Sequence, residues 1–588
     1  MKKILFCAFL MLAAGFSAAA GLVERTYVCT DRHSYVAGED VFCSVFCFDG
    51  GSGSLSDFSS VAYVELISPE GSAVRVKMAL QDGRGAGRLR LPSTLPTGNY
   101  RLIAYTALNR NEEDMDYFRG SRVISVYNTL SASRQDSVVP DGDAATAAVE
   151  GTGRPYGAAV AGKDHSYGAA VEGKGRPYGA AVEGKDRPYG AAAPAGLVME
   201  QRGDSLFLRN SGTECLDFCL SLSISDALPD PEGPGLADFL EARSGDRTTL
   251  RTDAKLSIPE YEGEIVSIRV PAMYSGVTAV LSGPGLRNDI YSSTVDSTGL
   301  VSFYTGNIYG DRDLVFELNS RDVNDDFSLE VLSPFASPEL DRDGVPELHL
   351  NGSVAEDLKR RSVAMQIGRH FGIDEYMDSL QLRPDLLFRG GTMTVYEMDD
   401  YTRFPTMRET IVEYVREVQI RRQDGEPVLK VVPGKSFESY SSMLGGNALV
   451  LVDGVPVSEH GRVLDLNPAL LRRICIYPYD VSTGSCIYSG VVNFISFRGD
   501  MAGLQFPGRV RILDFHGVTF PVTVGAAKED SLSPDYRYTR IWQPLLHLEA
   551  GEELELPLGK CGAEELRLEL EGVVGRSVAF STAALLKN

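Results

Sequence analysis

The cysteines, histidines and acidic clusters are the residues of this sequence whose chemistry could support catalysis or metal binding. None of the nine cysteines has the CxxC or Cys/His spacing of a zinc site, and the seven histidines do not cluster. The acidic segments 322–326 and 341–344 offer calcium ligands but lack the spacing and the terminal Glu of an EF-hand loop. No nucleophile elbow, zinc-protease motif or complete phosphate-binding loop is present. The sequence therefore predicts a protein that is not an enzyme and holds no metal or cofactor.

The cysteines could form disulfides in an exported chain. Cys43 and Cys47 lie four residues apart, about 13 Å along a strand at ~3.3 Å per residue, which is too far for a bond between them. Either of them could reach Cys29 on a neighbouring strand. The alternative is that several of the cysteines are small buried thiols.

The first 20 residues have the pattern of a secretory signal. Lys2 and Lys3 precede an uncharged apolar run, and small residues follow it at 17–20. The apolar run is shorter than the roughly 20 residues that a spanning helix needs, and no later segment is apolar enough to span. We therefore expect export to the periplasm or the outer-membrane periphery without a membrane-spanning segment. Disulfides are allowed in that compartment.

The charge of the chain excludes one class of partner. Its 57 Lys and Arg and 80 Asp and Glu give a formal net charge of −23. Because a phosphate backbone requires a cationic footprint, we expect no nucleic-acid binding.

Residues 21–130 read as short strands separated by turns, which predicts a β-sandwich. The segment 41–48 is apolar at nearly every position, as expected of a strand that is covered on both faces. Within 30–41, Tyr35 and the Gly38-Glu39 pair precede this strand, and this order resembles the start of a macroglobulin-type domain. Similar landmarks of that domain follow at 64–66, 91–92 and 98–106. The resemblance implies an immunoglobulin-like sandwich in which Gly38 and Glu39 form a turn and serve as scaffold.

The segment 131–196 is rich in Gly, Ala, Pro, Asp and Ser, and it contains four copies of an 11-residue unit between 153 and 196. The copies lack an apolar stripe and cannot bury enough surface to offset their chain entropy, so we predict a disordered linker. The alternative is a repeated bait peptide for proteases or for a partner.

Sequence patterns typical of β-strands return at 197–335 and predict one or two further sandwiches. A helical connector is predicted to follow at 336–395. The clearest helix is 353–371, which opens with a Ser353-x-x-Glu356 capping box. A second capping box, Thr406-x-x-Glu409, predicts another helix.

The order of motifs in 396–503 resembles the plug domain of TonB-dependent outer-membrane receptors. An apolar strand ends at Asp453-Gly454, an Asn467-Pro468 turn and a strand at 474–477 follow, and a strand at 490–495 completes the set. The resemblance implies a small α+β plug-like domain. Only about 85 residues remain after it, too few for the receptor barrel, so we expect this fold to serve as a binding module.

A contact site is predicted within this plug-like segment. Cys475 and Cys486 flank a polar loop, and a disulfide between them would staple it. We hypothesise that the stapled loop presents three tyrosines as a rigid partner-binding surface: Tyr477, Tyr479 and Tyr488. The alternative is that these tyrosines edge the core.

The last segment, 504–588, reads as a small β domain with the sole Trp, Trp542, in its core. Macroglobulins that trap proteases carry a Cys-Gly-Glu-Gln thioester motif. The nearest text here, 561–564, is shifted and lacks the Gln, so thioester chemistry is not expected.

The sequence thus predicts a mainly β, non-enzymatic envelope protein of tandem immunoglobulin-like or macroglobulin-like sandwiches with one plug-like α+β domain. Its partner would be an envelope protein or a component of an outer-membrane receptor. Two alternatives remain: a protease inhibitor without a thioester that uses the repeats as bait, and a surface adhesin that uses its sandwich loops.

Export is tested by the N-terminus of the mature protein. Because the A-x-A pattern ends at Ala20, we expect cleavage there and a mature chain that begins at Gly21. Mass spectrometry of the protein from fractionated cells measures this directly. A chain that retains residues 1–20 would contradict export by this signal.

Overall fold

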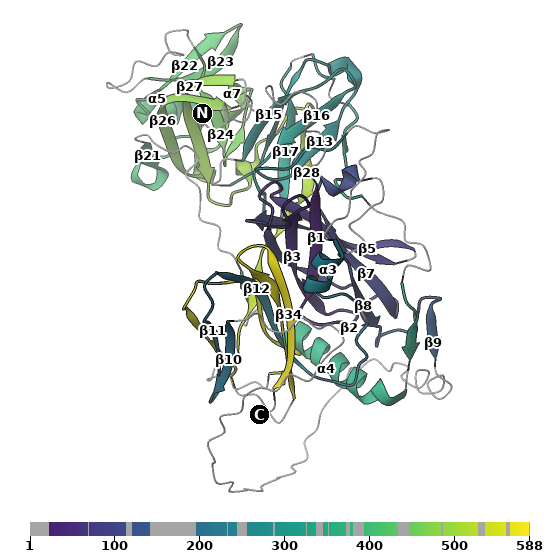
Figure 1. Ribbon diagram of the computed structural model, residues 1–588. Helices are drawn as coiled ribbons and strands as arrows, with labels where there is room; N and C mark the ends of the chain where they lie inside the picture. The colour runs from purple at the N-terminus through teal and green to yellow at the C-terminus, as the bar shows by residue number, and fades with distance from the viewer. Residues whose placement is uncertain are drawn as a thin grey trace, which may run out of the picture. The chain divides into compact units, whose positions relative to one another are not determined.

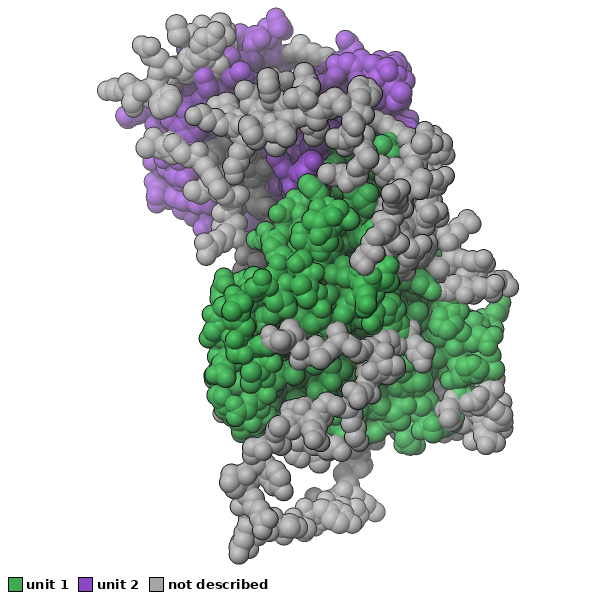
Figure 2. Space-filling view, viewed as in Figure 1, with its two compact units in different colours: residues 1–259, 336–380, 520–588 green, residues 260–335, 381–519 purple. Residues whose placement is uncertain are grey.

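The computed structural model forms two compact units, each assembled from separate stretches of the chain (Figure 2). Unit 1 lies within 1–259, 336–380 and 520–588, and unit 2 lies within 260–335 and 381–519. The residues that the structure describes are 23–68, 70–112, 120–140, 196–231, 233–243, 256–285, 289–320, 322–324, 326–336, 345–350, 352–371, 377–379, 393–432, 446–483, 486–526, 535–559 and 565–586. The predicted signal, 1–20, and most of the predicted repeat linker, 141–195, fall outside these ranges. The fold is mainly β, as predicted.

Unit 1 begins with the predicted sandwich. Its strands follow the order β1-β3-β6-β5-β4-β7-β8-β2, and only β2 and β8 pair in parallel. Buried side chains from both halves of this path meet in one core, which includes Val45, Val64 and Leu102. The strands are β1 (Glu24–Thr30), β2 (Ser34–Val36), β3 (Asp40–Asp49), β4 (Val61–Ser68), β5 (Gly71–Gln81), β6 (Arg84–Arg90), β7 (Gly98–Tyr105) and β8 (Arg122–Tyr127).

Strand β3 is buried on both faces, which confirms the prediction from its continuous apolar run. Cys43, Val45 and Cys47 point into the core of the first sandwich, and the alternate residues point to the other face. Cys29 lies opposite Ser44 and therefore shares that other face. The sheet therefore separates Cys29 from Cys43 and Cys47, which excludes the bond that spacing alone had left open and agrees with the alternative of buried thiols for Cys43 and Cys47.

The second sandwich of unit 1 combines strands from distant parts of the chain. One sheet has the order β20-β30-β31-β12-β33-β34 and the other β10-β11-β32, with a leucine-rich core between them. The colours of β12 and β34 in Figure 1 show how far apart in the sequence these strands lie. The strands are β10 (Leu197–Arg202), β11 (Ser205–Asn210), β12 (Leu216–Ile224), β20 (Met377–Ser379), β30 (Val522–Val524), β31 (Thr539–Leu548), β32 (Glu553–Pro557), β33 (Leu566–Val574) and β34 (Val578–Leu586).

This sandwich corrects the predicted boundaries at 335 and 504. Strand β12 from the segment 197–335 pairs with β31 and β33 from the segment 504–588, so the two segments share a sheet instead of forming separate domains. Strand periodicity shows which residues form strands but not which distant strands pair, and for this reason the shared sheet could not be predicted.

The two sandwiches of unit 1 pack against each other through one apolar cluster, which we call the interface cluster. Trp542 is fully buried in it, which confirms the predicted burial but corrects its place, because the cluster lies between two sandwiches and not inside a separate C-terminal domain. Its members come from the outer faces of β1 and β3 and from the sheet of β12, with helix α3 (Leu236–Arg243) alongside. They are Tyr27, Cys29, Phe42, Phe46, Phe48, Leu55, Cys219, Leu236, Phe239, Val522, Val524, Trp542 and Val573.

Helix α4 (Ala355–Phe371) packs beside β2 and completes unit 1 together with the parallel pair β9 (Val138–Pro140) and β19 (Leu348–Leu350). The predicted helix is confirmed, but the α-helix begins at Ala355 because residues 352–354 form a 3₁₀ turn.

Unit 2 contains one sandwich and one α+β part. The sandwich joins the sheets β16-β13-β18 and β15-β14-β17-β28 around a core that includes Phe303 and Phe316. Its strands are β13 (Ile265–Arg269), β14 (Thr278–Ser282), β15 (Ile290–Thr294), β16 (Leu300–Tyr304), β17 (Asp311–Leu318), β18 (Glu330–Val331) and β28 (Val510–His516), and β29 (Val518–Thr519) follows.

The α+β part covers most of the segment predicted to be plug-like. Its sheet has the order β21-β26-β27-β24-β25, in which β24 and β27 are parallel. The predicted Asp453-Gly454 strand end is a two-residue hairpin turn with both φ angles positive, at 50° and 85°. The elements are β21 (Thr394–Glu397), α5 (Met407–Tyr414), β22 (Val418–Gln423), β23 (Glu426–Val431), β24 (Leu449–Val452), β25 (Val455–Pro456), α7 (His460–Leu464), β26 (Leu471–Thr483) and β27 (Cys486–Ser496).

Both capping signals of this part act as predicted. Thr406 accepts a hydrogen bond from the backbone N–H of Glu409 at 3.3 Å and begins α5. Asn467 accepts one from Ala469 at 2.9 Å and starts the short turn at Pro468. None of the helices in the described residues is long and apolar enough to cross a membrane.

His460 gives unit 2 a dependence on pH. Its ring is buried, and its Nδ1 accepts a hydrogen bond from the backbone N–H of Leu429 at 2.9 Å. Burial lowers the pKa of His460 to about 4. The unfolded chain therefore binds a proton at this residue below about pH 6.5 while the folded chain does not. The stability that depends on neutral His460 is therefore fully present above about pH 6.5, and it is lost as the pH falls toward 4.

We predict that His460→Asn removes this dependence, because the amide oxygen of Asn accepts the same hydrogen bond and does not titrate. Amide hydrogen exchange of β23 and β24 should show that the wild-type opening free energy falls by about 2 kcal/mol between about pH 6.5 and pH 4, relative to the variant. The exposed His516→Asn is the matched control and should behave as wild type. Equal pH profiles of wild type and His460→Asn would contradict the assignment.

Candidate functional site

The three tyrosines of the predicted contact surface lie together on the β26–β27 hairpin, but they form part of an internal cluster. Tyr477 is only 6% exposed, and Tyr479 and Tyr488 are half-buried and pack against the cluster that contains Leu451 and Val491. The rings of Tyr477 and Tyr479 meet edge to face at 6.0 Å. Burial raises the pKa of both Tyr477 and Tyr488 to about 12. This arrangement matches the alternative in which the tyrosines edge a core, and it corrects the predicted exposed surface.

The register of the β26–β27 hairpin keeps Cys475 and Cys486 apart, so the predicted disulfide between them is corrected. Cys486 lies opposite Thr483 at the tip of the hairpin, and Cys475 lies opposite Asn493 further along it. Eight residues of strand separate Cys475 from Thr483, which is roughly 25 Å at ~3.3 Å per residue. A disulfide requires Cα atoms within about 7 Å, so the hairpin register excludes this one.

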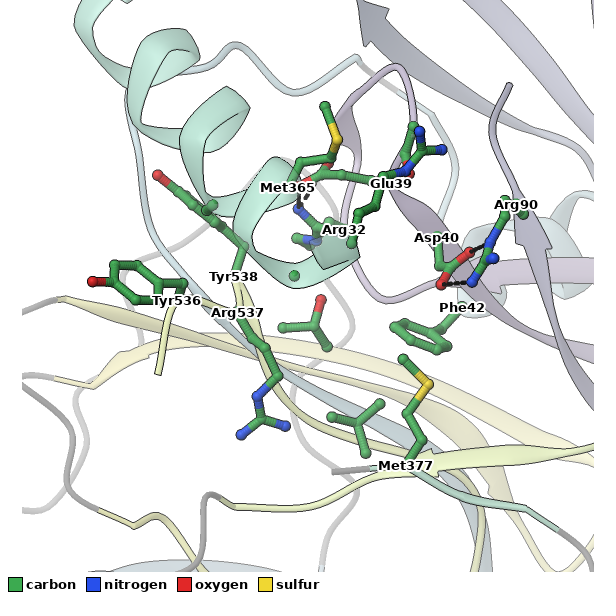
Figure 3. A pocket seen from close by; sticks show the side chains of 16 residues that line it. Arg32, Glu39, Asp40, Phe42, Arg90, Met365, Met377, Tyr536, Arg537 and Tyr538 are labelled. Carbon is green, nitrogen blue, oxygen red and sulfur yellow. Dashed lines mark hydrogen bonds and ion pairs between the residues drawn. The ribbon is translucent and has the colours of Figure 1, made fainter. Parts of the chain in front are cut away.

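A pocket of about 180 Å³ in unit 1 is the site that combines apolar walls with charged groups (Figure 3). We call it the arginine pocket. Its walls come from the turn before β3, from β6, from helix α4, from β20 and β30, and from the segment that leads into β31. The lining residues are Arg32, Gly38, Glu39, Asp40, Phe42, Arg90, Ala364, Met365, Gly368, Arg369, Met377, Val524, Tyr536, Arg537, Tyr538 and Thr539.

The turn at Gly38-Glu39 shapes one wall of the pocket. Gly38 has a φ of +102°, and a Cβ there would lie 3.1 Å from the sulfur of Met365 and 3.2 Å from the guanidinium carbon of Arg369. Only glycine therefore allows helix α4 to lie this close to the turn. Glu39 fixes the turn by accepting a hydrogen bond from the backbone N–H of Val36 at 2.8 Å. The turn was predicted as scaffold, and the structure adds that it lines the pocket.

Arg32 is held rigidly behind this turn. It contacts Asp31 at 3.1 Å and Glu39 at 3.3 Å. Burial opposes the charged form, but Glu39 and Asp31 together raise the pKa of Arg32, so the guanidinium stays charged. The Asp31 carboxylate also accepts hydrogen bonds from the Tyr35 hydroxyl at 2.8 Å and from the Phe42 N–H at 3.0 Å. This network fixes the position of the charge in the wall.

Two further arginines of the pocket are paired with carboxylates. Arg90 contacts Asp40 at 3.1 Å at the rim, as Figure 3 shows. Arg537 contacts Asp535 at 2.7 Å. Burial opposes ionisation of Asp535, but Arg537 and its neighbour Arg540 lower the pKa of that carboxyl. Both pairs leave their arginines with little capacity for an added anion.

Arg369 differs from the other three arginines of the pocket in its hydrogen-bond partner. It is exposed on the last turn of α4, and its Nε donates a hydrogen bond to the carbonyl of Gly38 at 3.2 Å. Within the described residues it has no carboxylate partner. The Gly38 contact orients the guanidinium, and both terminal nitrogens remain as donors toward an anion at the pocket mouth.

Apolar side chains form the remainder of the pocket: Phe42, Ala364, Met365, Met377 and Val524. Pockets for whole small molecules occupy about 300–1,000 Å³, so a volume of about 180 Å³ suits one side chain or one end group. The arrangement can bind an apolar group that lies next to an anion. In the described parts of the chain, no three His, Cys, Asp or Glu side chains converge so as to hold a metal ion, and 341–344 is not among them.

Sequence reasoning missed this pocket because its residues come from segments between 32 and 539 that no local pattern connects. One signal was available. The run 536–540, Tyr-Arg-Tyr-Thr-Arg, places two arginines among tyrosines at the start of a strand in an acidic chain.

Comparisons with known proteins give no family. No protein-family model matches the chain, and no curated protein is detectably similar. Among solved structures, Salmonella alpha-2-macroglobulin reacted with methylamine matches at 9% identity with a TM-score of 0.22, over 96% of this chain and 39% of that one. Escherichia coli alpha-2-macroglobulin activated by porcine elastase matches at 10% identity with a TM-score of 0.22, over 96% of this chain and 44% of that one. The chain thus spans about two fifths of the length of these proteins. At these scores the similarity carries no functional inference, and the plug-like resemblance of 396–503 stays a prediction.

Proposed function

We propose that this chain is an exported, non-enzymatic binding protein of the periplasm or the outer-membrane periphery. Its arginine pocket would take one apolar side chain or chain end of a partner protein, with an adjacent carboxylate held by Arg369. The partner would be an envelope protein or a component of an outer-membrane receptor. The signal-like residues 1–20 and the plug-like sequence of 396–503 support the location.

The observation that carries the proposal is the position of Arg369 at the mouth of an apolar pocket. The Gly38 carbonyl orients its guanidinium, and the described residues give it no carboxylate. A preoriented guanidinium forms two parallel hydrogen bonds with a carboxylate, and these are stronger than hydrogen bonds between neutral groups. The small volume favours a single anchoring group of a protein partner over a free metabolite.

The inhibitor and adhesin alternatives have no comparable support. The repeats that would act as bait lie outside the described residues. The pocket, by contrast, lies within the described residues of unit 1, and ion pairs such as that of Arg32 with Asp31 fix its walls.

We predict that N-acetylphenylalanine, which carries an aromatic side chain beside a free carboxylate, binds this pocket more tightly than its uncharged amide. Arg369→Gln should weaken binding of the acid about tenfold and leave binding of the amide unchanged, because only the acid uses the guanidinium. A chemical-shift titration of the full chain with each probe measures both affinities.

Lys359→Gln is the matched control, since Lys359 is exposed on the same helix and lies outside the pocket. Ala364→Trp should weaken both probes by filling the pocket. Equal affinity for acid and amide in the wild type, wild-type binding by Arg369→Gln, or no binding of either probe would overturn the proposal.

A further inference from the structure

Two thiols from distant strands meet in the interface cluster. The sulfur of Cys29 on β1 lies 2.9 Å from the sulfur of Cys219 on β12, although the residues are 190 positions apart. Both side chains are buried, at 1% and 4% exposure. Both strands belong to unit 1, so the contact lies within one compact body.

The geometry favours this pair over the other cysteines near Cys29. The sheet directs Cys43 and Cys47 into the core of the first sandwich, away from Cys29. Cys219 lies on the face of β12 that packs against β1. A sulfur–sulfur bond is about 2.05 Å long, so the two sulfurs need to approach by less than about 1 Å, within reach of small side-chain rotations.

We propose that Cys29 and Cys219 form a disulfide in the exported protein. This bond would join the first and second sandwiches of unit 1 covalently. The oxidant is a disulfide donor, either a thiol oxidoreductase or a small disulfide such as oxidised glutathione. One thiolate attacks the donor disulfide to form a mixed disulfide and releases the first donor thiol, and the second thiolate attacks the mixed disulfide and releases the other donor thiol. The Cys29–Cys219 bond forms, the donor bond breaks, and the donor leaves as two thiols that take up both electrons and both protons.

Burial determines when this exchange occurs. It raises the pKa of the Cys29 thiol, so little thiolate is present in the folded state, and a donor has no access to either sulfur. The bond therefore forms while the two sandwiches come together, before the interface cluster closes. Once formed, it resists reductants under native conditions. The disulfide would close a loop of the chain that contains the whole predicted linker, 131–196, with its repeats.

The experiment is refolding of the reduced full chain with oxidised glutathione, followed by denaturation in N-ethylmaleimide and non-reducing trypsin digestion. We expect mass spectrometry to find peptide 26–32, which contains Cys29, joined to peptide 210–243. The second peptide contains both Cys215 and Cys219, so two variants assign the bond. The link should survive Cys215→Ser and be lost in Cys219→Ser.

Labelled Cys29 in the refolded wild type, a link from Cys29 to another cysteine, or a link that survives Cys219→Ser would overturn the proposal.

Thermal unfolding gives a second readout that does not depend on one variant. The oxidised wild type should melt on the order of 5 °C or more above the Cys29→Ala/Cys219→Ala double variant. Reductant present during refolding should remove that difference. Equal melting temperatures of oxidised and reduced wild type would contradict the bond.

Discussion

The burial of aromatic and aliphatic side chains between the two sandwiches of unit 1 is the interaction on which most of this structure depends. Strands β1 and β3 place Tyr27, Phe46 and Phe48 on the face opposite their own core, and Trp542 meets them from β31. Each large apolar side chain that is fully buried stabilises the folded state by about 1.5–3 kcal/mol. Left apart, each sandwich would expose a contiguous apolar face, which soluble proteins rarely tolerate.

A polar rim borders this cluster and fixes its register. Arg122 on β8 contacts Glu571 on β33 at 2.9 Å, and the Tyr27 hydroxyl donates to the same carboxylate at 3.0 Å. Burial opposes the charge on Arg122, but Glu571 raises the pKa of Arg122, so the guanidinium remains charged. Removing one partner would leave the other charge buried and unpaired, which is strongly destabilising. The rim thus specifies one alignment of two apolar faces that hydrophobic contact alone would leave loosely defined.

The arginine pocket follows from the same packing. Its walls belong to the turn at Gly38, to helix α4 and to the segment 535–539, and the packing of the second sandwich against β3 brings the last of these to the other two. Thr539 donates a hydrogen bond directly to Asp31, the carboxylate that also holds Arg32. The position of the charged wall therefore depends on contact between strands some 500 residues apart in sequence. A binding site of this kind can be rigid because both of its halves are buried in cores.

Local signals in the sequence predicted local structure well. The continuous apolar run of β3 predicted burial on both faces, Thr406 and Asn467 predicted their turns, and Trp542 was placed in a core. Pairings between distant strands could not be predicted, because alternation identifies a strand without naming its neighbour. The same limit explains the predicted Cys475–Cys486 bond. Spacing along the chain suggested proximity, whereas hairpin register decides which residues face each other.

We expect the two sandwiches of unit 1 to unfold as one cooperative body, and the sole Trp reports on this directly. Urea unfolding followed by Trp542 fluorescence should be compared between wild type, Leu102→Ala and Leu570→Ala, which truncate buried leucines in the cores of the first and second sandwich. Each substitution costs about 2–5 kcal/mol. If unit 1 is one body, both variants shift the Trp542 midpoint to lower urea by similar amounts. If Leu102→Ala leaves that midpoint unchanged while Leu570→Ala lowers it, the sandwiches unfold independently and the account is contradicted.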